Sequence, residues 1–365
     1  MARILPFIAL LAGVPLLPQT AQQTMPLEDY QPKSTLVVPE HLVKRAKYPF
    51  IDIHNHQWDT SPAHLTQLLA DMDALNMRIL VDSPVMNGCC DWVRNAVANI
   101  RTAGKGRFVV MTNIDYRNLD APDYSARAAA QLENDIHEGA VALKVWKNFG
   151  MYMKDSKGQR IHVDDPRFDA VFETCAKYHI PVMIHTADPR PLFQPMDKYN
   201  ERWLELKSHP DRNQTAGTGP SWETLIQEQH NLFARHPHTI FIDAHMGWLA
   251  NDLGQLGALL DRLPNVYVEI GAISSELGRQ PRFARAFFEK YQDRILFGKD
   301  SYVIPEYWTY FRLLETADEY FDPTRRYHGF WQLYGLDLPD PILKKLYYKN
   351  ALHILPTLSH DGFPQ

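Results

Sequence analysis

Eight short apolar segments alternate with amphipathic segments along the chain, and this alternation restricts the fold more than any other feature. Between most of these apolar segments, apolar residues recur at helical spacing, for example at residues 63–76 and 253–263. We predict strands at 48–56, 78–82, 107–113, 140–146, 180–185, 239–245, 266–270 and 294–300. Parallel strands require crossover connections of this length, and eight β/α units make a (β/α)8 barrel. The sequence therefore predicts a single α/β domain, a TIM barrel over residues 46–355.

The alternative with the same alternation is a doubly wound open sheet. That fold usually carries a Gly-rich phosphate loop after the first strand, whereas residues 55–58 read NHQW. Two connections are long, at 147–166 and 186–238, and both follow strands whose ends would lie at the mouth of a barrel. We interpret them as candidate lids, with plain insertions as the alternative. The region after the last strand is expected to be largely helical to Leu355, followed by a tail at 356–365.

The first strand carries ionisable side chains on one face. Ile51 and Ile53 alternate with Asp52, His54 and His56, so the apolar and polar side chains point to opposite sides. Two imidazoles two residues apart are about 7 Å apart at their Cα atoms, close enough to bind one metal ion. Histidines that only form hydrogen bonds at a strand end are the alternative.

Further ionisable residues lie late in the other predicted strands. Lys144 lies late in the fourth strand, and the fifth, sixth and eighth strands end in His185, His245 and Asp300. The carboxyl ends of barrel strands meet at one mouth, where barrel enzymes bind their substrates. These residues are therefore predicted to gather with the histidines of the first strand.

Together these segments resemble the amidohydrolase superfamily and, more narrowly, its amidohydrolase-related metallohydrolases and decarboxylases. The resemblance spans residues 47–355. It is carried by DIHNH at 52–56, KVWKN at 144–148, IHTADP at 184–189, AHMG at 244–247, ILFGKD at 295–300 and YKNA at 348–351. It implies that His54, His56 and His185 bind a metal and that Asp300 is a ligand or general base. It makes His245 the acid/base or electrophile that polarises the substrate.

Metal chemistry suits these residue types independently of the resemblance. Imidazoles and a carboxylate favour Zn²⁺, with Mn²⁺ as the alternative, and leave a position for water or substrate. The resemblance favours one ion over two. Lys144 stays ambiguous: carboxylated, it would bridge two metals, and unmodified it would bind a substrate carboxylate or pair with a barrel carboxylate.

Candidate substrate contacts lie just beyond the strand ends. Arg279 and Arg282 follow the seventh strand, and their guanidinium groups would suit an anionic substrate; ordinary helix-surface arginines are the alternative. Trp58 and Trp146 are candidate pocket walls, with packing as the alternative. Lys299 departs from the family, which mostly has Thr there, and strand alternation predicts that it points away from Asp300.

These observations predict a metal-dependent hydrolase that cleaves an amide, lactone or ester of a small molecule. The alternative is a metal-dependent, non-oxidative decarboxylase of an aromatic or unsaturated carboxylic acid. A non-catalytic binding protein would require a lost ligand, and the pattern has all of them.

Composition and the N-terminal segment limit the partners and the location. The net charge is −5 without a basic cluster, which argues against nucleic acid as a partner. Residues 1–21 have the short basic start and apolar run of a signal peptide, so we expect an exported protein, periplasmic or secreted, with a retained anchor as the alternative. Residues 22–45 are expected to be a linker. The three cysteines are interpreted as free thiols. The aromatic-rich region 302–331 could cover a homodimer interface.

Overall fold

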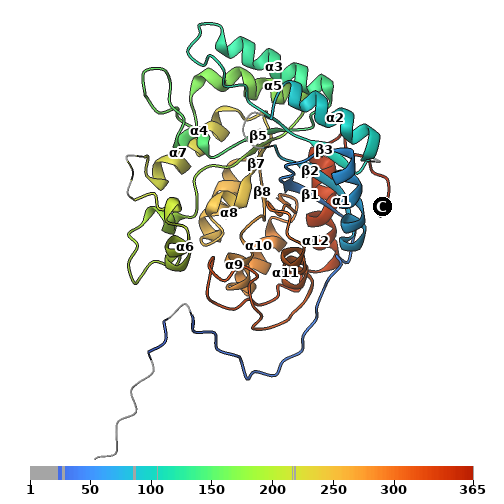
Figure 1. Cartoon of the computed structure of the whole chain (residues 1–365), viewed down its shortest axis with the longest axis vertical. Helices are drawn as coiled ribbons and strands as arrows, with labels where there is room; N and C mark the ends of the chain where they lie inside the picture. The colour runs from blue at the N-terminus through green and yellow to red at the C-terminus, as the bar shows by residue number, and fades with distance from the viewer. Residues whose placement is uncertain are drawn as a thin grey trace, which may run out of the picture. The chain divides into compact units, whose positions relative to one another are not determined.

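The structure is a computed structural model that describes residues 24–26, 29–84, 88–104, 106–215, 217 and 219–364 (Figure 1). The predicted signal peptide, residues 1–21, lies outside this range, so export stays a prediction. The chain divides into two units, Met1–Val37 and Val38–Gln365. The described residues of the first unit form neither an α-helix nor a strand. The second unit contains all the elements named below.

Short parallel strands form the centre of the second unit (Figure 1). They are β1 (Phe50–Asn55), β2 (Met77–Asp82), β3 (Phe108–Val110), β4 (Thr112–Asn113), β5 (Leu143–Val145), β6 (Val182–Ile184), β7 (Phe241–Asp243), β8 (Val266–Glu269) and β9 (Ile295–Leu296). The pairs follow chain order in two sheets, β1-β2-β3 and β4-β5-β6-β7-β8-β9. The predicted third strand is divided into β3 and β4 at Met111, and the other predicted strands each contain one observed strand.

Backbone hydrogen bonds connect the two sheets at both of their junctions. At the first, Met111 N–H donates to Asp82 O (2.9 Å) and Val141 N–H donates to Val110 O (2.9 Å). At the second, Ile53 N–H donates to Phe297 O (3.1 Å), beside a parallel bridge between residues 55 and 300. The last strand therefore lies beside the first, as the predicted (β/α)8 barrel requires.

Helices follow most of the strands and surround them in Figure 1. They are α1 (Pro62–Leu75), α2 (Asp91–Ala103), α3 (Tyr124–Glu138), α4 (Asn148–Met151), α5 (Asp169–Tyr178), α6 (Trp203–Ser208), α7 (Trp222–Arg235), α8 (Leu253–Arg262), α9 (Ser274–Gly278), α10 (Pro281–Lys290), α11 (Ile304–Glu315), α12 (Asp340–Lys344) and α13 (Asn350–Ile354). Local sequence fixes several boundaries. The Ser61 hydroxyl accepts the His64 N–H at the start of α1, and left-handed Asn76 ends that helix. Among the described residues, no helix is long and apolar enough to cross a membrane.

Two regions differ from the helical pattern expected of the sequence. The long connection 186–238 contains two helices, α6 and α7. In α7, Trp222, Leu225 and Phe233 form a buried helical face. The C-terminal region is not continuously helical: residues 316–339 are irregular apart from an antiparallel bridge between Phe321 and Leu333. Part of this irregular segment lines a cavity that is described in the next subsection.

Candidate active site

Hydrogen bonds fix the tautomers of His54, in β1, and of His56, one residue after β1. His54 Nδ1 donates to the Glu269 carboxylate at 3.0 Å, and His56 Nδ1 donates to the carbonyl oxygen of Ser83. The second nitrogen of each ring, Nε2, therefore keeps its lone pair. A metal-binding imidazole normally donates its other N–H to a carboxylate or carbonyl in this way. Both residues have the tautomer that a metal ligand requires.

Asp300 brings a carboxylate to these lone pairs. Its Oδ1 lies 3.3 Å from His56 Nε2 and 3.6 Å from His54 Nε2. Donor atoms at about 2.1 Å from one tetrahedral ion would be about 3.4 Å apart, which matches both separations. Burial alone would raise the pKa of Asp300, but contact with His56 and with the other nearby histidines holds it well below its usual range. The carboxylate is therefore ionised at neutral pH.

His185 and His245 form a second pair of imidazoles, with rings 4.5 Å apart, and the His245 ring lies 5.1 Å from that of His54. Nε2 of each is buried and has no hydrogen-bond partner among the described residues. His245 donates its Nδ1–H to Gly271 O (2.8 Å) and stacks on Trp248 (4.4 Å). The ligand atoms of His54, His56 and Asp300 lie within 4.8 Å of one another, whereas His185 is not part of that group.

These residues suit a divalent metal ion. Two imidazole nitrogens and a carboxylate oxygen converge with the spacing of a tetrahedral site. Buried polar atoms normally have a hydrogen-bond partner, but Nε2 of His185 and Nε2 of His245 have none among the described residues. Burial also lowers the pKa of His54 to about 3 and holds the pKa of His185 well below its usual range, so both imidazoles are neutral, as metal binding requires.

Lys144 also contacts this group, from β5 inside the barrel. Its Nζ lies 2.7 Å from His54 Nε2 and it is 1% exposed. Burial lowers the pKa of Lys144 to about 8. The sequence left open whether Lys144 bridges two metals, binds a substrate carboxylate or pairs with a barrel carboxylate. In the structure its contact is with an imidazole of the barrel.

Glu269, at the end of β8, is a site residue that the sequence reasoning missed. One carboxylate accepts from His54 Nδ1, from His245 N–H (2.6 Å) and from Gly271 N–H (2.6 Å). Burial would raise its pKa, but His54 and the other donors lower it to about 2. The available signal was a lone Glu in an otherwise apolar strand, placed like the histidines at the strand end.

Left-handed backbone surrounds the site. His245, Met246, Gly247 and Trp248 have φ between 53° and 60°, and together form a left-handed turn after β7. Ala187, Ala272 and Asp300, after three other strands, are also left-handed. Each such non-Gly residue costs about 1–2 kcal/mol, so surrounding contacts must hold the turn. The hydrogen bond from His245 N–H to Glu269 is one of them.

A cavity lined by Asp300, His185 and His245 opens at this site. Its other charged or imidazole-bearing lining residues are Lys147, Asp188, Arg202, Glu205, Arg212, Arg325 and His328. Most of them form ion pairs, such as Lys147–Asp188 (2.6 Å) and Arg212–Glu205 (2.6 Å). Both predicted lid segments, 147–166 and 186–238, contribute to this wall, as does the irregular segment 316–339.

A sequence profile of the amidohydrolase family matches residues 51–357, which is most of the chain. The chain belongs to the amidohydrolase family. Enzymes of this family act on small molecules and generally bind a divalent metal. Among curated proteins, no sequence matches this amidohydrolase.

Solved structures support the barrel fold of this amidohydrolase. A putative amidohydrolase from Staphylococcus aureus is 15% identical with a TM-score of 0.55, covering 84% of this chain and 99% of its own. An uncharacterised TIM-barrel protein from Bordetella bronchiseptica is 15% identical with a TM-score of 0.53, covering 84% and 98%. At this identity the likeness concerns the fold.

Most of the predicted substrate contacts of this amidohydrolase lie away from the cavity wall. Arg279 pairs with Glu201 and Glu276, and Arg282 is exposed on α10. Trp58 is 82% exposed. The ring of Trp146 lies 5.1 Å from that of His56, so it borders the predicted metal ligands without lining the cavity. The cations on the wall come instead from the two long connections, 147–166 and 186–238, and from the irregular segment 316–339.

Proposed function

We propose that this amidohydrolase is a metal-dependent hydrolase that cleaves an amide, lactone or ester bond of a small molecule. The observation that carries the proposal is the position of Asp300. Its ionised carboxylate lies against two imidazole lone pairs and also lines the cavity. A group in this position can serve the metal and the reacting molecule together.

In this proposal, His54, His56, His185 and Asp300 hold one divalent ion, with Zn²⁺ favoured over Mn²⁺. The ion would supply Lewis acidity, which lowers the pKa of water and polarises a carbonyl group. Asp300 accepts the proton of the attacking water, because it is the ionised group beside the ligand nitrogens. The left-handed turn holds His245 Nε2 at the cavity. Because Nδ1–H is donated to Gly271 O, Nε2 is free to take up the proton that Asp300 has accepted and to pass it to the leaving group.

Non-oxidative decarboxylation is the second candidate. The observation that favours it is the cationic part of the cavity wall, where Lys147, Arg202, Arg212 and Arg325 could hold a substrate carboxylate. The same wall also carries Asp188 and Glu205, which pair with three of these cations. We therefore rank hydrolysis first.

Metal analysis combined with activity assays tests the proposal. We expect about one zinc or manganese per chain, together with hydrolysis of compounds in a panel of lactones, amides and esters. An intact mass increased by one CO2, with two metals, would instead indicate carboxylated Lys144. Release of CO2 from aromatic acids, without hydrolysis of any panel member, would overturn the proposal in favour of decarboxylation.

A further inference from the structure

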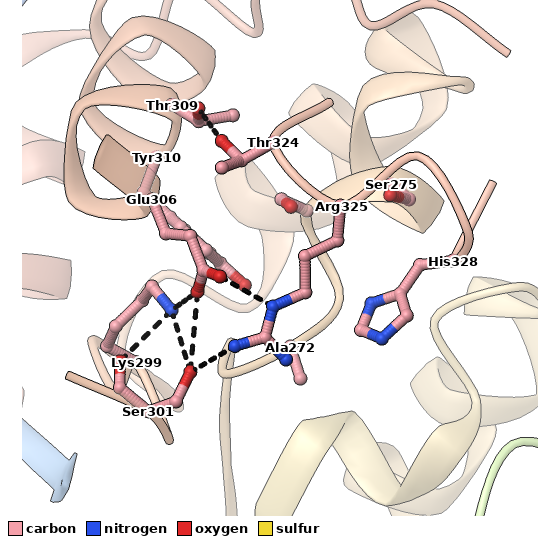
Figure 2. Close-up of a pocket in the computed structure, with 11 residues that line it drawn as sticks. Ala272, Ser275, Lys299, Ser301, Glu306, Thr309, Tyr310, Thr324, Arg325 and His328 are labelled. Atoms are coloured by element: carbon pink, nitrogen blue, oxygen red, sulfur yellow. Dashed lines mark hydrogen bonds and ion pairs between the residues drawn. The ribbon is translucent and has the colours of Figure 1, made fainter. Parts of the chain in front are cut away.

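A second, small cavity adjoins the active-site cavity (Figure 2). The two cavities share Ala272, Arg325 and His328 in their walls. Hydroxyl groups line much of the second cavity, from Ser274, Ser275, Ser301, Thr309, Tyr310 and Thr324. Since Ser301 directly follows Asp300 in the chain, this polar cavity begins one residue from the proposed base.

The charges in the second cavity do not balance. Lys299 and Arg325 both form ion pairs with the single carboxylate of Glu306. These three are the charged residues among those that line the cavity, so two cations share one anion. The Lys299 side chain is 2% exposed, whereas that of Arg325 is 28% exposed. The charge of Asp300, one residue before Ser301, also reaches both cations. Arg325 is therefore the cation that a ligand could approach from the active-site cavity.

Arg325 is held with one side of its guanidinium group unused. Its Nε donates to Glu306 (2.5 Å), and its Nη2 donates to Ser301 Oγ (2.6 Å). The remaining nitrogen, Nη1, makes no hydrogen bond within the described part of the chain. In Figure 2 it lies on the side of Ala272, in the wall that the two cavities share.

We propose that Arg325 binds a carboxylate of the substrate, and that the substrate class is a small acid whose carboxylate lies a few bonds from the cleaved bond. Glu306 and Ser301 hold the guanidinium group in place before the substrate binds. The free energy of binding therefore does not include the entropy cost of ordering the Arg325 side chain. The His328 side chain is 12% exposed, and burial and nearby arginines lower its pKa to about 2, so it is neutral and offers a further hydrogen bond without adding charge. This inference rests on the proposed function, because the reacting bond must lie at Asp300.

Binding of unreactive dicarboxylates tests the inference. The probes are malonate, succinate and glutarate, compared with acetate and neutral succinamide, by calorimetry on zinc-loaded and metal-stripped protein. We expect at least one dicarboxylate to bind the zinc-loaded wild type, and Arg325→Gln to weaken that binding roughly 10–100-fold. Acetate binding should not depend on Arg325, and succinamide should bind far more weakly than succinate.

Matched variants separate this role from a structural one. Arg282→Gln removes an exposed arginine outside both cavities and should leave dicarboxylate binding unchanged. Arg325→Lys keeps the pair with Glu306 but removes the planar group, so it should weaken binding even if Arg325→Gln fails to fold. Dicarboxylate binding that is equal in wild type and Arg325→Lys overturns the inference, as does no binding of any dicarboxylate to the wild type.

The two proposals fail in distinguishable ways. If the wild type does not retain zinc after loading but still binds dicarboxylates in a way that depends on Arg325, the carboxylate site is supported and the metal centre is contradicted. Stoichiometric zinc with dicarboxylate binding that ignores Arg325 would support the metal centre and overturn the carboxylate site.

Discussion

Nζ of Lys144 lies 2.7 Å from Nε2 of His54, the nitrogen that a bound metal ion would require. Burial lowers the pKa of Lys144 to about 8, so the ammonium form predominates at pH 7 and the neutral amine above pH 8. Metal binding at pH 7 must therefore displace an ammonium group from the His54 lone pair.

We expect zinc binding to release about one proton from Lys144 at pH 7, and close to none above about pH 9. Calorimetry in two buffers with different ionisation enthalpies measures this number. In Lys144→Met the release should disappear, while zinc still binds. Equal proton release by wild type and variant would contradict the prediction.

Glu269→Gln should weaken zinc binding about 10–100-fold, because the residue fixes the tautomer of His54. The side-chain amide of Gln would also place its own N–H groups opposite the backbone N–H groups of His245 and Gly271, which donate to the carboxylate in the wild type. Competition with a chromogenic chelator measures the affinity. Glu201→Gln, at an exposed carboxylate paired with Arg279, is the control and should have no effect. Unchanged zinc affinity in Glu269→Gln would exclude this positioning role.

His185→Ala should lose at least tenfold in zinc affinity, together with most of the activity, while the barrel stays folded. Its Nε2 is buried beside His245 without a partner among the described residues. His137→Ala removes an exposed histidine on α3 and should retain full metal content. A His185→Ala protein with stoichiometric metal and full turnover would remove His185 from the ligand set.

Asp82→Asn should flatten the dependence of stability on pH. Burial raises the pKa of Asp82 to about 7, so between about pH 4 and 7 the folded state binds a proton that the unfolded state has lost. The free energy of unfolding therefore falls as pH rises through this window, by at most about 4 kcal/mol for this group. Urea unfolding at pH 5 and pH 8 measures the difference. Exposed Asp91→Asn is the control, and an equal pH effect in wild type and Asp82→Asn would refute the assignment.

Gly247→Ala should destabilise the protein by roughly 1–3 kcal/mol and lower turnover. Gly247 has φ of 60°, and a Cβ there would overlap the carboxylate of Asp243. Gly158→Ala provides the matched control, because it has a positive φ (77°) but open space around the added Cβ. Thermal unfolding and steady-state kinetics of both variants separate backbone strain from overlap. Equal behaviour of the two variants would contradict a specific role for the turn that carries His245.

Periodicity in the sequence predicted the barrel because period 2 and helical spacing are local properties of the chain. The predicted strand ends at His54, His56, His245 and Asp300 lie together for the same reason: the carboxyl ends of parallel strands share one face. Strand alternation also predicted that Lys299 points away from Asp300; in the structure its ammonium group pairs with Glu306 in the second cavity.

The cavity wall was less predictable because it depends on pairings between distant segments. Arg279 looked available in the sequence, but Glu276 and Glu201 engage it. Arg325 gave no signal, because its position beside Ser301 depends on the path of an irregular segment. Glu269 could have been found from its place at a strand end.

The proposed metal ligands come from the ends of the barrel strands, whereas most other charged residues of the cavity wall come from other parts of the chain, and this has a consequence for redesign. His54 and His56 belong to the barrel, whereas Arg212 and Arg325 come from long connections that cross its mouth. Exchanging those connections would alter the choice of reactant while leaving the reactive centre intact. A library restricted to residues 186–238 and 316–339 should therefore yield altered selectivity at a higher frequency than mutations spread evenly over the gene.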